Sequence, residues 1–146
     1  MKTINNERWR RAVVSDDANF NSRTGEWFGG IWYDGTWYNG EWHRGHACRM
    51  KWLDGKWNKG SWDGGIWHKG KWKDGDWNGG TWISGDWNNG TWSKGVWISG
   101  NWSKGTCLDG IAWKTGVVRM FQETTISPKA HYKPKRTIAL NCAKYN

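Results

Sequence analysis

This chain of 146 residues lacks several features that would assign it to a familiar class of protein. No apolar run approaches the roughly 18 residues that a membrane-spanning helix needs. Residues 1–11 are polar, so they do not read as a signal peptide, and we expect a soluble chain that is not secreted by that route. No nucleophile stands beside a base, and no phosphate-binding loop or paired-carboxylate site is present. We therefore expect neither catalysis nor a cofactor.

Cysteine is also scarce, and its arrangement excludes a simple disulfide framework or a zinc module. The chain has three cysteines, Cys48, Cys107 and Cys142. Their number is odd and their spacing is not that of metal ligands, so we expect reduced thiols.

Tryptophan and glycine, in contrast, are abundant and periodic. Fifteen of the 17 tryptophans recur at five-residue intervals, each two residues after the first residue of a GxWxx unit. Eighteen such units run from Gly25 through Lys114. A period of five fits neither the 3.6 of a helix nor the 2 of a strand, and a glycine in each unit would cost an α-helix roughly 1 kcal/mol. The pattern predicts a β-helix solenoid that turns a corner every five residues.

The tryptophans are predicted to point inward. Fifteen exposed indoles would form an apolar surface far larger than soluble monomers usually show. One unit carries Ala47 in place of Trp, and three residues later Met50 replaces Gly. This exchange of volumes indicates that both columns face one close-packed interior. The last position of each unit is mostly Asp, Asn, Gly, Ser or Lys, so we place the corner there, just before the next glycine.

Residues 18–22, with the sequence ANFNS, match position by position the repeat unit of the pentapeptide-repeat family. In that unit a small residue is followed by Asp or Asn, a central Leu or Phe and two variable positions. The GxWxx array resembles a variant with Gly as the small residue and Trp at the centre. The resemblance implies a right-handed β-helix, four-sided with four units per coil. A central indole has an N–H that needs an acceptor when buried, and backbone carbonyls could supply it.

The residues alone do not decide the number of sides. The units that lack Trp, at Ala47 and Cys107, lie sixty residues apart, and both three-sided and four-sided coils place them on one face. We expect three segments: an N-terminal cap over residues 1–24, which includes the family-like unit, the β-helix over 25–114, and a basic C-terminal cap or tail over 115–146.

Side chains that follow Trp are predicted to point outward. In the first coil they are aromatic and form a possible partner surface, composed of Phe28, Tyr33, Tyr38 and His43. Either the N-terminal segment of the chain or a partner protein would cover them. A second outward group, near the other end, is apolar and comprises Ile83, Val96, Ile98, Leu108 and Ile111. His43, His46 and Cys48 are close in sequence, but a solenoid directs them to successive faces, so we expect no metal site.

Positive charge is concentrated at the C-terminus. Residues 117–146 carry six basic groups and one acidic group (+5), whereas residues 25–116 carry eleven and nine (+2). Possible contacts to an anion or nucleic acid are Lys129, Lys133, Lys135 and Arg136, with a solvated terminus as the alternative. Some pentapeptide-repeat proteins mimic DNA, but that role requires a strongly acidic surface, which this column lacks.

These features favour a non-catalytic structural or protein-interaction module. GxWxx arrays also resemble those in uncharacterised proteins of tailed bacteriophages, which implies a tail, baseplate or capsid accessory protein in the virion or the host cytoplasm. Its partners would be virion components or a second copy bound through the end coils, with no membrane and no small-molecule substrate. One alternative is a nucleic-acid-binding protein that acts through the basic tail. The other is a glycan-binding surface, which would need outward tryptophans.

Overall fold

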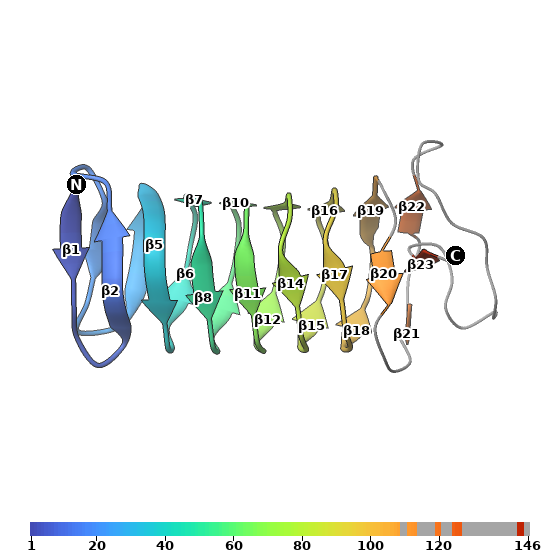
Figure 1. Ribbon diagram of the computed structural model, residues 1–146, viewed down its shortest axis with the longest axis horizontal. Coiled ribbons are helices and arrows are strands. Elements are labelled where there is room, and N and C mark those ends of the chain that lie inside the picture. Colours follow the sequence, from blue (N-terminus) through green and yellow to red (C-terminus); the bar gives the residue numbers. More distant parts are fainter. Residues whose placement is uncertain (109–110, 114–118, 121–123, 127–142, 145–146) are drawn as a thin grey trace.

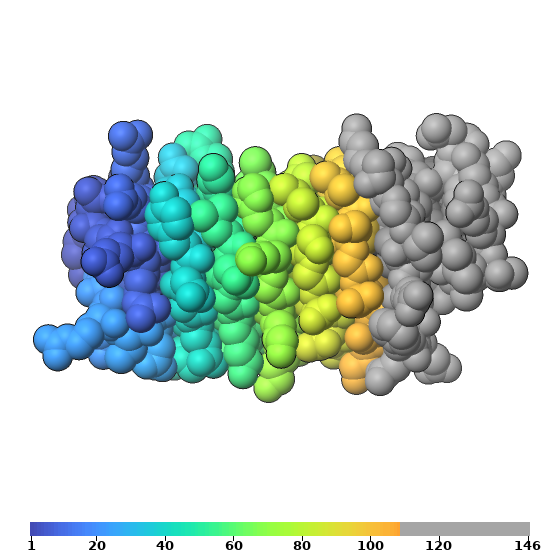
Figure 2. Space-filling model, turned by 90° about the horizontal axis from the view of Figure 1, so that it is seen from below, coloured from blue at the N-terminus to red at the C-terminus, as the bar shows by residue number. Residues whose placement is uncertain are grey.

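The computed structural model describes residues 1–108, 111–113, 119–120, 124–126 and 143–144, with side chains described for residues 1–108. Every regular element among these residues is a β-strand. The strands stack as successive coils along the long axis of the molecule (Figure 1). In the space-filling view the coils appear as bands of consecutive colour from the N-terminal end onward (Figure 2). The predicted all-β solenoid is confirmed.

Each coil contains fifteen residues rather than twenty. Trp57, for example, pairs in parallel register with Trp42 on one side and Trp72 on the other. Three five-residue units therefore complete a coil, and the four-sided coil implied by the family resemblance is wrong. The physical reason is the size of the indole. Neighbouring tryptophans within a coil already meet edge to face, with ring centroids 5.8 Å apart for Trp57 and Trp62, so three side chains close the cross-section.

We name the three faces of the column by their outward side chains. The charged face is formed by β4 (Glu26–Gly29), β6 (Glu41–Trp42), β9 (Lys56–Trp57), β12 (Lys71–Trp72), β15 (Asp86–Trp87) and β18 (Asn101–Trp102). The apolar face is formed by the second half of β5 (Ile31–Trp37), then β8 (Met50–Trp52), β11 (Gly65–Trp67), β14 (Thr81–Trp82) and β17 (Val96–Trp97). The third face is formed by the first half of β5, then β7 (His46–Ala47), β10 (Ser61–Trp62), β13 (Asp76–Trp77), β16 (Thr91–Trp92) and β19 (Gly105–Cys107).

The core consists of three columns of stacked indoles. Every tryptophan whose side chain is described is fully buried, as are Ala47 and Met50, so the predicted inward direction of both columns is confirmed. Along a column, rings such as Trp57 and Trp72 lie 4.8 Å apart and only 5° from parallel. This distance equals the spacing of about 4.8 Å between hydrogen-bonded strands. The backbone ladder and the ring stack therefore share one repeat distance and reinforce each other.

Indole N–H groups are only partly satisfied. Three of them donate to the backbone carbonyl seventeen residues later, each at 3.1 Å, in the pairs Trp52 to Lys69, Trp72 to Asn89 and Trp87 to Lys104. For these indoles the expected carbonyl acceptor is confirmed. Other indole nitrogens, including those of Trp57 and Trp62, are buried without a hydrogen-bond acceptor among the described residues. Each such donor costs roughly 1–3 kcal/mol, which ring stacking and burial must exceed.

The corners depend on glycine as well as on the residue before it. Gly70, for example, has a φ of +125°, and a Cβ there would lie 2.5 Å from the carbonyl oxygen of Gly55 in the preceding coil. The chain also bends at the preceding residue, such as Asp54, Lys69 and Asp74, so the predicted position of the corner is confirmed and the glycine completes it. Asp and Asn at the preceding position contribute differently, since the carboxylate of Asp54 accepts the N–H of Gly55 at 2.8 Å. Such a side chain satisfies a corner donor that the coil ladder leaves unpaired.

The N-terminal segment closes one end of the indole core. β1 (Lys2–Ile4) and β2 (Trp9–Val14) form an antiparallel pair, and β2 also pairs antiparallel with β5. Trp9 stacks on Trp37 with centroids 5.0 Å apart. β3 (Asn19–Asn21) pairs antiparallel with β4, and Phe20 stacks on Trp27 at 5.8 Å. Residues 18–22 therefore place an aromatic ring inward as the family unit would, but they run against the coils and are not one of them.

Strands at the end of the repeats and beyond them extend the same parallel ladders at the other end. These strands are β20 (Ile111–Trp113), β21 (Arg119–Met120), β22 (Thr124–Ile126) and β23 (Ala143–Lys144). Met120 pairs with Trp102, so β21 continues the charged face. The solenoid thus includes strands from the segment that the sequence assigned to a cap.

Two cysteines have different states. Cys107 takes the place of a tryptophan in the same column as Ala47, as both coil models predicted. It is disulfide-bonded, so the expected reduced thiol is wrong at this position, whereas Cys48 is free. Sequence spacing could not reveal the bond because disulfide pairing depends on which Cβ atoms approach in space.

Candidate interaction surfaces

The structure distributes the predicted aromatic surface over all three faces. Phe28 and His43 lie together on the charged face, where their rings stack with centroids 5.0 Å apart. Tyr33 follows Trp32 on the third face, and Tyr38 follows Trp37 on the apolar face, where it is 40% exposed. The N-terminal segment covers the end of the core, where Trp9 stacks on Trp37 and Phe20 stacks on Trp27. The four residues therefore do not form one continuous patch.

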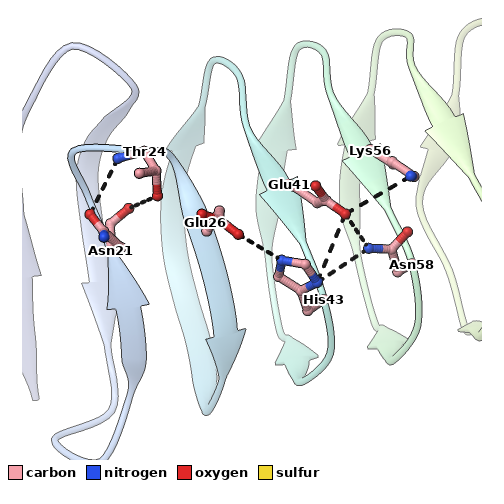
Figure 3. A network of polar contacts seen from close by, with 7 residues as sticks. All are labelled: Asn21, Thr24, Glu26, Glu41, His43, Lys56 and Asn58. Atoms are coloured by element: carbon pink, nitrogen blue, oxygen red, sulfur yellow. Dashed lines mark hydrogen bonds and ion pairs between the residues drawn. The ribbon is translucent and has the colours of Figure 1, made fainter.

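A polar network on the charged face surrounds His43 (Figure 3). The Nε2 atom of His43 lies 3.2 Å from a carboxylate oxygen of Glu26, and Nδ1 lies 3.8 Å from Glu41. The amide of Asn58 donates to Glu41 at 2.7 Å, and Lys56 lies 4.0 Å from the same carboxylate. The network thus crosses three successive coils through β4, β6 and β9.

The carboxylate of Glu26 in this network is stabilised in its charged form. The side chain of Thr24, and after it the ring of His43, hold the pKa of Glu26 below its ordinary value. Glu26 stands directly opposite Glu41 in the parallel ladder. Because like charges opposite each other destabilise a sheet, the ion pair of Lys56 with Glu41 offsets part of their repulsion.

An open groove runs beside this network along a glycine corner. Its volume is about 800 Å³, and it extends over several coils between the charged and apolar faces. The floor of the groove is the corner backbone, and its walls carry carboxylates and ammonium groups, with the lining residues Glu26, Glu41, Lys56, Lys71 and Asp86 on the charged side. Acidic residues occupy the N-terminal coils and lysines the next two. The groove can therefore receive charged side chains of either sign at defined positions.

The apolar face is a second candidate surface. Outward positions before Trp are occupied by Thr36, Lys51, Ile66, Thr81 and Val96, and those after Trp by Tyr38, Leu53, His68, Ile83 and Ile98. Burial, and to a smaller extent Lys51, lowers the pKa of His68 below its ordinary value of 6.5, so its ring is neutral at pH 7. Lys51 is therefore the one formal charge in these two rows.

Part of the predicted apolar group at the far end lies on this face. Ile83, Val96 and Ile98 are neighbours there, whereas Leu108 follows Cys107 on the third face and is 39% exposed. The side chain of Ile111 lies outside the described residues. The sequence grouped Leu108 with the others because all of them occupy outward positions near one end of the array, but only the coil length shows which of them share a face.

His43, His46 and Cys48 do not converge. His43 is on the charged face, while His46 and Cys48 are on the third face, where Nε2 of His46 lies 2.8 Å from a carboxylate oxygen of Asp63. Within residues 1–108 no group of three or more His, Cys, Asp or Glu side chains is placed to hold a metal ion. Burial and the nearby Asp63 raise the pKa of the Cys48 thiol, so it remains protonated at neutral pH.

The predicted basic contacts Lys129, Lys133, Lys135 and Arg136 lie outside the described residues. Among the residues that the structure does describe, there is no helix long and apolar enough to cross a membrane.

The charge row of the charged face was missed in the sequence. Its signal is present once the chain is written in rows of fifteen, because Glu26, Glu41, Lys56 and Lys71 then stand in one line. The tryptophan period of five did not indicate that row length.

Comparison with known proteins gives no guide to function, since no family model, no curated protein and no solved structure matches the chain.

Proposed function

We propose that this protein is a non-catalytic structural module that binds other proteins through the sides of a rigid column, in the setting of a tailed-bacteriophage virion. The observation that carries the proposal is the apolar face. Ile66 is 40% exposed in the middle of two outward rows that contain a single formal charge, and each of the five coils contributes at least one apolar or aromatic side chain to these rows. Contiguous apolar surface of this kind is typical of protein interaction sites.

The core supports a scaffold role. Its stacked indoles are fully buried, so large changes of shape would separate rings that now lie 4.6–5.0 Å apart. A column that holds its shape can present side chains at the constant spacing of about 4.8 Å set by the strand ladder. The virion setting is supported by the resemblance of the GxWxx array to phage proteins.

The glycan-binding alternative loses the feature on which it depended. It required outward tryptophans as stacking platforms, and every tryptophan with a described side chain is fully buried. The nucleic-acid alternative depends on tail residues outside the described part of the chain.

Fractionation of particles from the source of this chain tests the proposal. We expect the protein to co-sediment with assembled particles at a fixed ratio. A variant with Ile66→Glu and Ile98→Glu should fold but leave the particle fraction, because charge on the apolar face opposes docking. The matched control carries Thr91→Glu and Ser93→Glu, the equivalent two positions on the third face, and should still co-sediment. Absence of the wild-type protein from particles, or equal incorporation of both variants, would contradict the proposal.

A further inference from the structure

The charge row on the charged face carries an inference that is independent of the apolar face. Glu26, Glu41, Lys56 and Lys71 occupy the same outward position on four successive coils. Two of the three neighbouring steps therefore bring like charges together, at the spacing of about 4.8 Å between strands. Like charges directly opposite each other destabilise a sheet, so the isolated chain bears a cost in this row.

Contacts within the chain offset this cost only in part. Glu41 lies 4.0 Å from Lys56, and Glu26 lies 3.2 Å from His43. Lys71 is exposed and forms no ion pair with the described residues, although Asp86 stands next to it in the ladder. The lysine end of the row thus has a charge available for a partner.

We propose that a second copy of this chain packs antiparallel against the charged face, with a two-fold axis that crosses the row between Glu41 and Lys56. In each copy the row reads acid, acid, base, base. When the row of the second copy runs in the opposite direction, each acidic residue of one copy stands opposite a basic residue of the other. Glu26 would then face Lys71 of the second copy, and Glu41 would face its Lys56. Both like-charge steps within each chain are thereby matched by opposite charges across the interface, and the surface patch is the same on both partners, as two-fold symmetry requires.

The neighbouring rows fit the same axis. Phe28 comes opposite Lys73 of the second copy, an arrangement suited to a cation–π contact, and His43 comes opposite Asn58. Asp86 faces the neutral Asn21, which continues the row beyond Glu26. Among the described residues of this face, Arg44 and Lys59 would be the one like-charge approach, at its exposed margin, where the guanidinium of Arg44 is turned toward the carbonyl oxygen of Phe28.

The shape of the surface allows this approach. The open groove of about 800 Å³ lies beside the charge row, and its glycine floor carries no side chains to hold the second copy away. Exposed ion pairs are individually weak and are screened by salt. The pairing is therefore a low-affinity association that salt dissolves, and it leaves the apolar face free.

Zero-length carbodiimide cross-linking tests the proposal directly. Glu26 and Lys71 of one chain are three coil steps apart, or about 14 Å, too far for an amide bond within the chain. The experiment uses a mixture of ¹⁴N- and ¹⁵N-labelled full-length protein at 0.1 M salt. We expect a cross-link between Glu26 and Lys71 in which one peptide carries ¹⁴N and the other ¹⁵N, because such a pair joins two copies of the chain. Its yield should fall at least fivefold at 0.5 M salt. Absence of this cross-link at millimolar protein, or a yield that salt does not change, would overturn the proposal.

Charge-swapped variants provide the matched controls, with association measured by sedimentation equilibrium. The variants E26K/E41K and K56E/K71E should each be monomeric alone and should associate when mixed. The quadruple variant E26K/E41K/K56E/K71E restores the self-complementary order with its signs reversed, so it should self-associate as the wild type does. Circular dichroism checks folding of each variant. Self-association that survives both double variants would assign the dimer to another face and overturn the proposal, while the proposed docking through the apolar face would stand.

Discussion

Glycine is the residue on which the corners of this column depend. At Gly70 two separate constraints coincide, because φ is +125° and a Cβ would meet the carbonyl oxygen of Gly55 at 2.5 Å and the indole nitrogen of Trp52 at 3.2 Å. Gly29 differs, since its φ is not in the left-handed region and a Cβ there would meet no atom within 4 Å. Identical residues in the sequence thus have different structural roles.

The first prediction compares these two glycines. Gly70→Ala should lower the free energy of unfolding by about 2–5 kcal/mol, because left-handed strain and overpacking add. Gly29→Ala should change it by no more than about 0.5 kcal/mol. Urea denaturation followed by circular dichroism measures both. Similar values for the two variants would show that the corner does not have the tight backbone approach described above.

At the scale of the structural elements, most units of the array form a strand of only two or three residues. The register between strands of successive coils therefore determines the fold. Ser61 pairs with Asp76, fifteen residues later, on the third face. Thr81, twenty residues after Ser61, lies on the apolar face instead. A four-sided coil of twenty residues would instead pair Ser61 with Thr81 and place Asp76 on a different face.

The second prediction tests this register by disulfide cross-linking in a Cys48→Ser background. Residues directly opposite in adjacent strands have Cα atoms within the range of 4.4–6.8 Å or so that a disulfide requires. We expect rapid oxidation of the pair S61C/D76C and none within the monomer for S61C/T81C, as judged by mass spectrometry under mild oxidation. A preference for the second pair would support coils of twenty residues.

The unit that lacks tryptophan shows what sequence patterns can predict about packing. Ala47 and Met50 are both in the buried core, so the inference that each faces the interior is confirmed. That the large Met50 compensates for the small Ala47 stays a prediction. It follows from the close packing of interiors, where a lost volume must be filled.

A double-mutant cycle measures that compensation. Ala47→Trp alone should destabilise by about 1–3 kcal/mol through overpacking, and Met50→Gly alone by about 2–5 kcal/mol through a cavity. Together they restore the GxWxx pattern, so the double variant should be more stable than the sum of the single changes predicts, by at least about 1 kcal/mol. Additivity within about 0.5 kcal/mol would show that the two sites are independent.

For the whole molecule, the tryptophan period predicted the solenoid and its indole interior but could not give the number of sides. The two irregular units at Ala47 and Cys107 lie sixty residues apart, a multiple of both fifteen and twenty. Their spacing is therefore compatible with both coil lengths. Without the coil length, the sequence could not predict which outward side chains are neighbours. This applies to the row from Glu26 to Lys71 and to the pair Ile83 and Ile98. Those surfaces are properties of register, which the local pattern of five residues does not contain.

The central claim is that the indoles form a buried, stacked core and leave the outer faces to other side chains. Iodide quenching of tryptophan fluorescence tests this most directly, in a Trp113→Phe background that removes the one indole whose side chain lies outside the described residues. We predict that iodide quenches the native protein several-fold less than the protein unfolded in guanidinium chloride, because every remaining indole is inaccessible to solvent. Quenching of the native protein as strong as that of the unfolded chain would contradict the account.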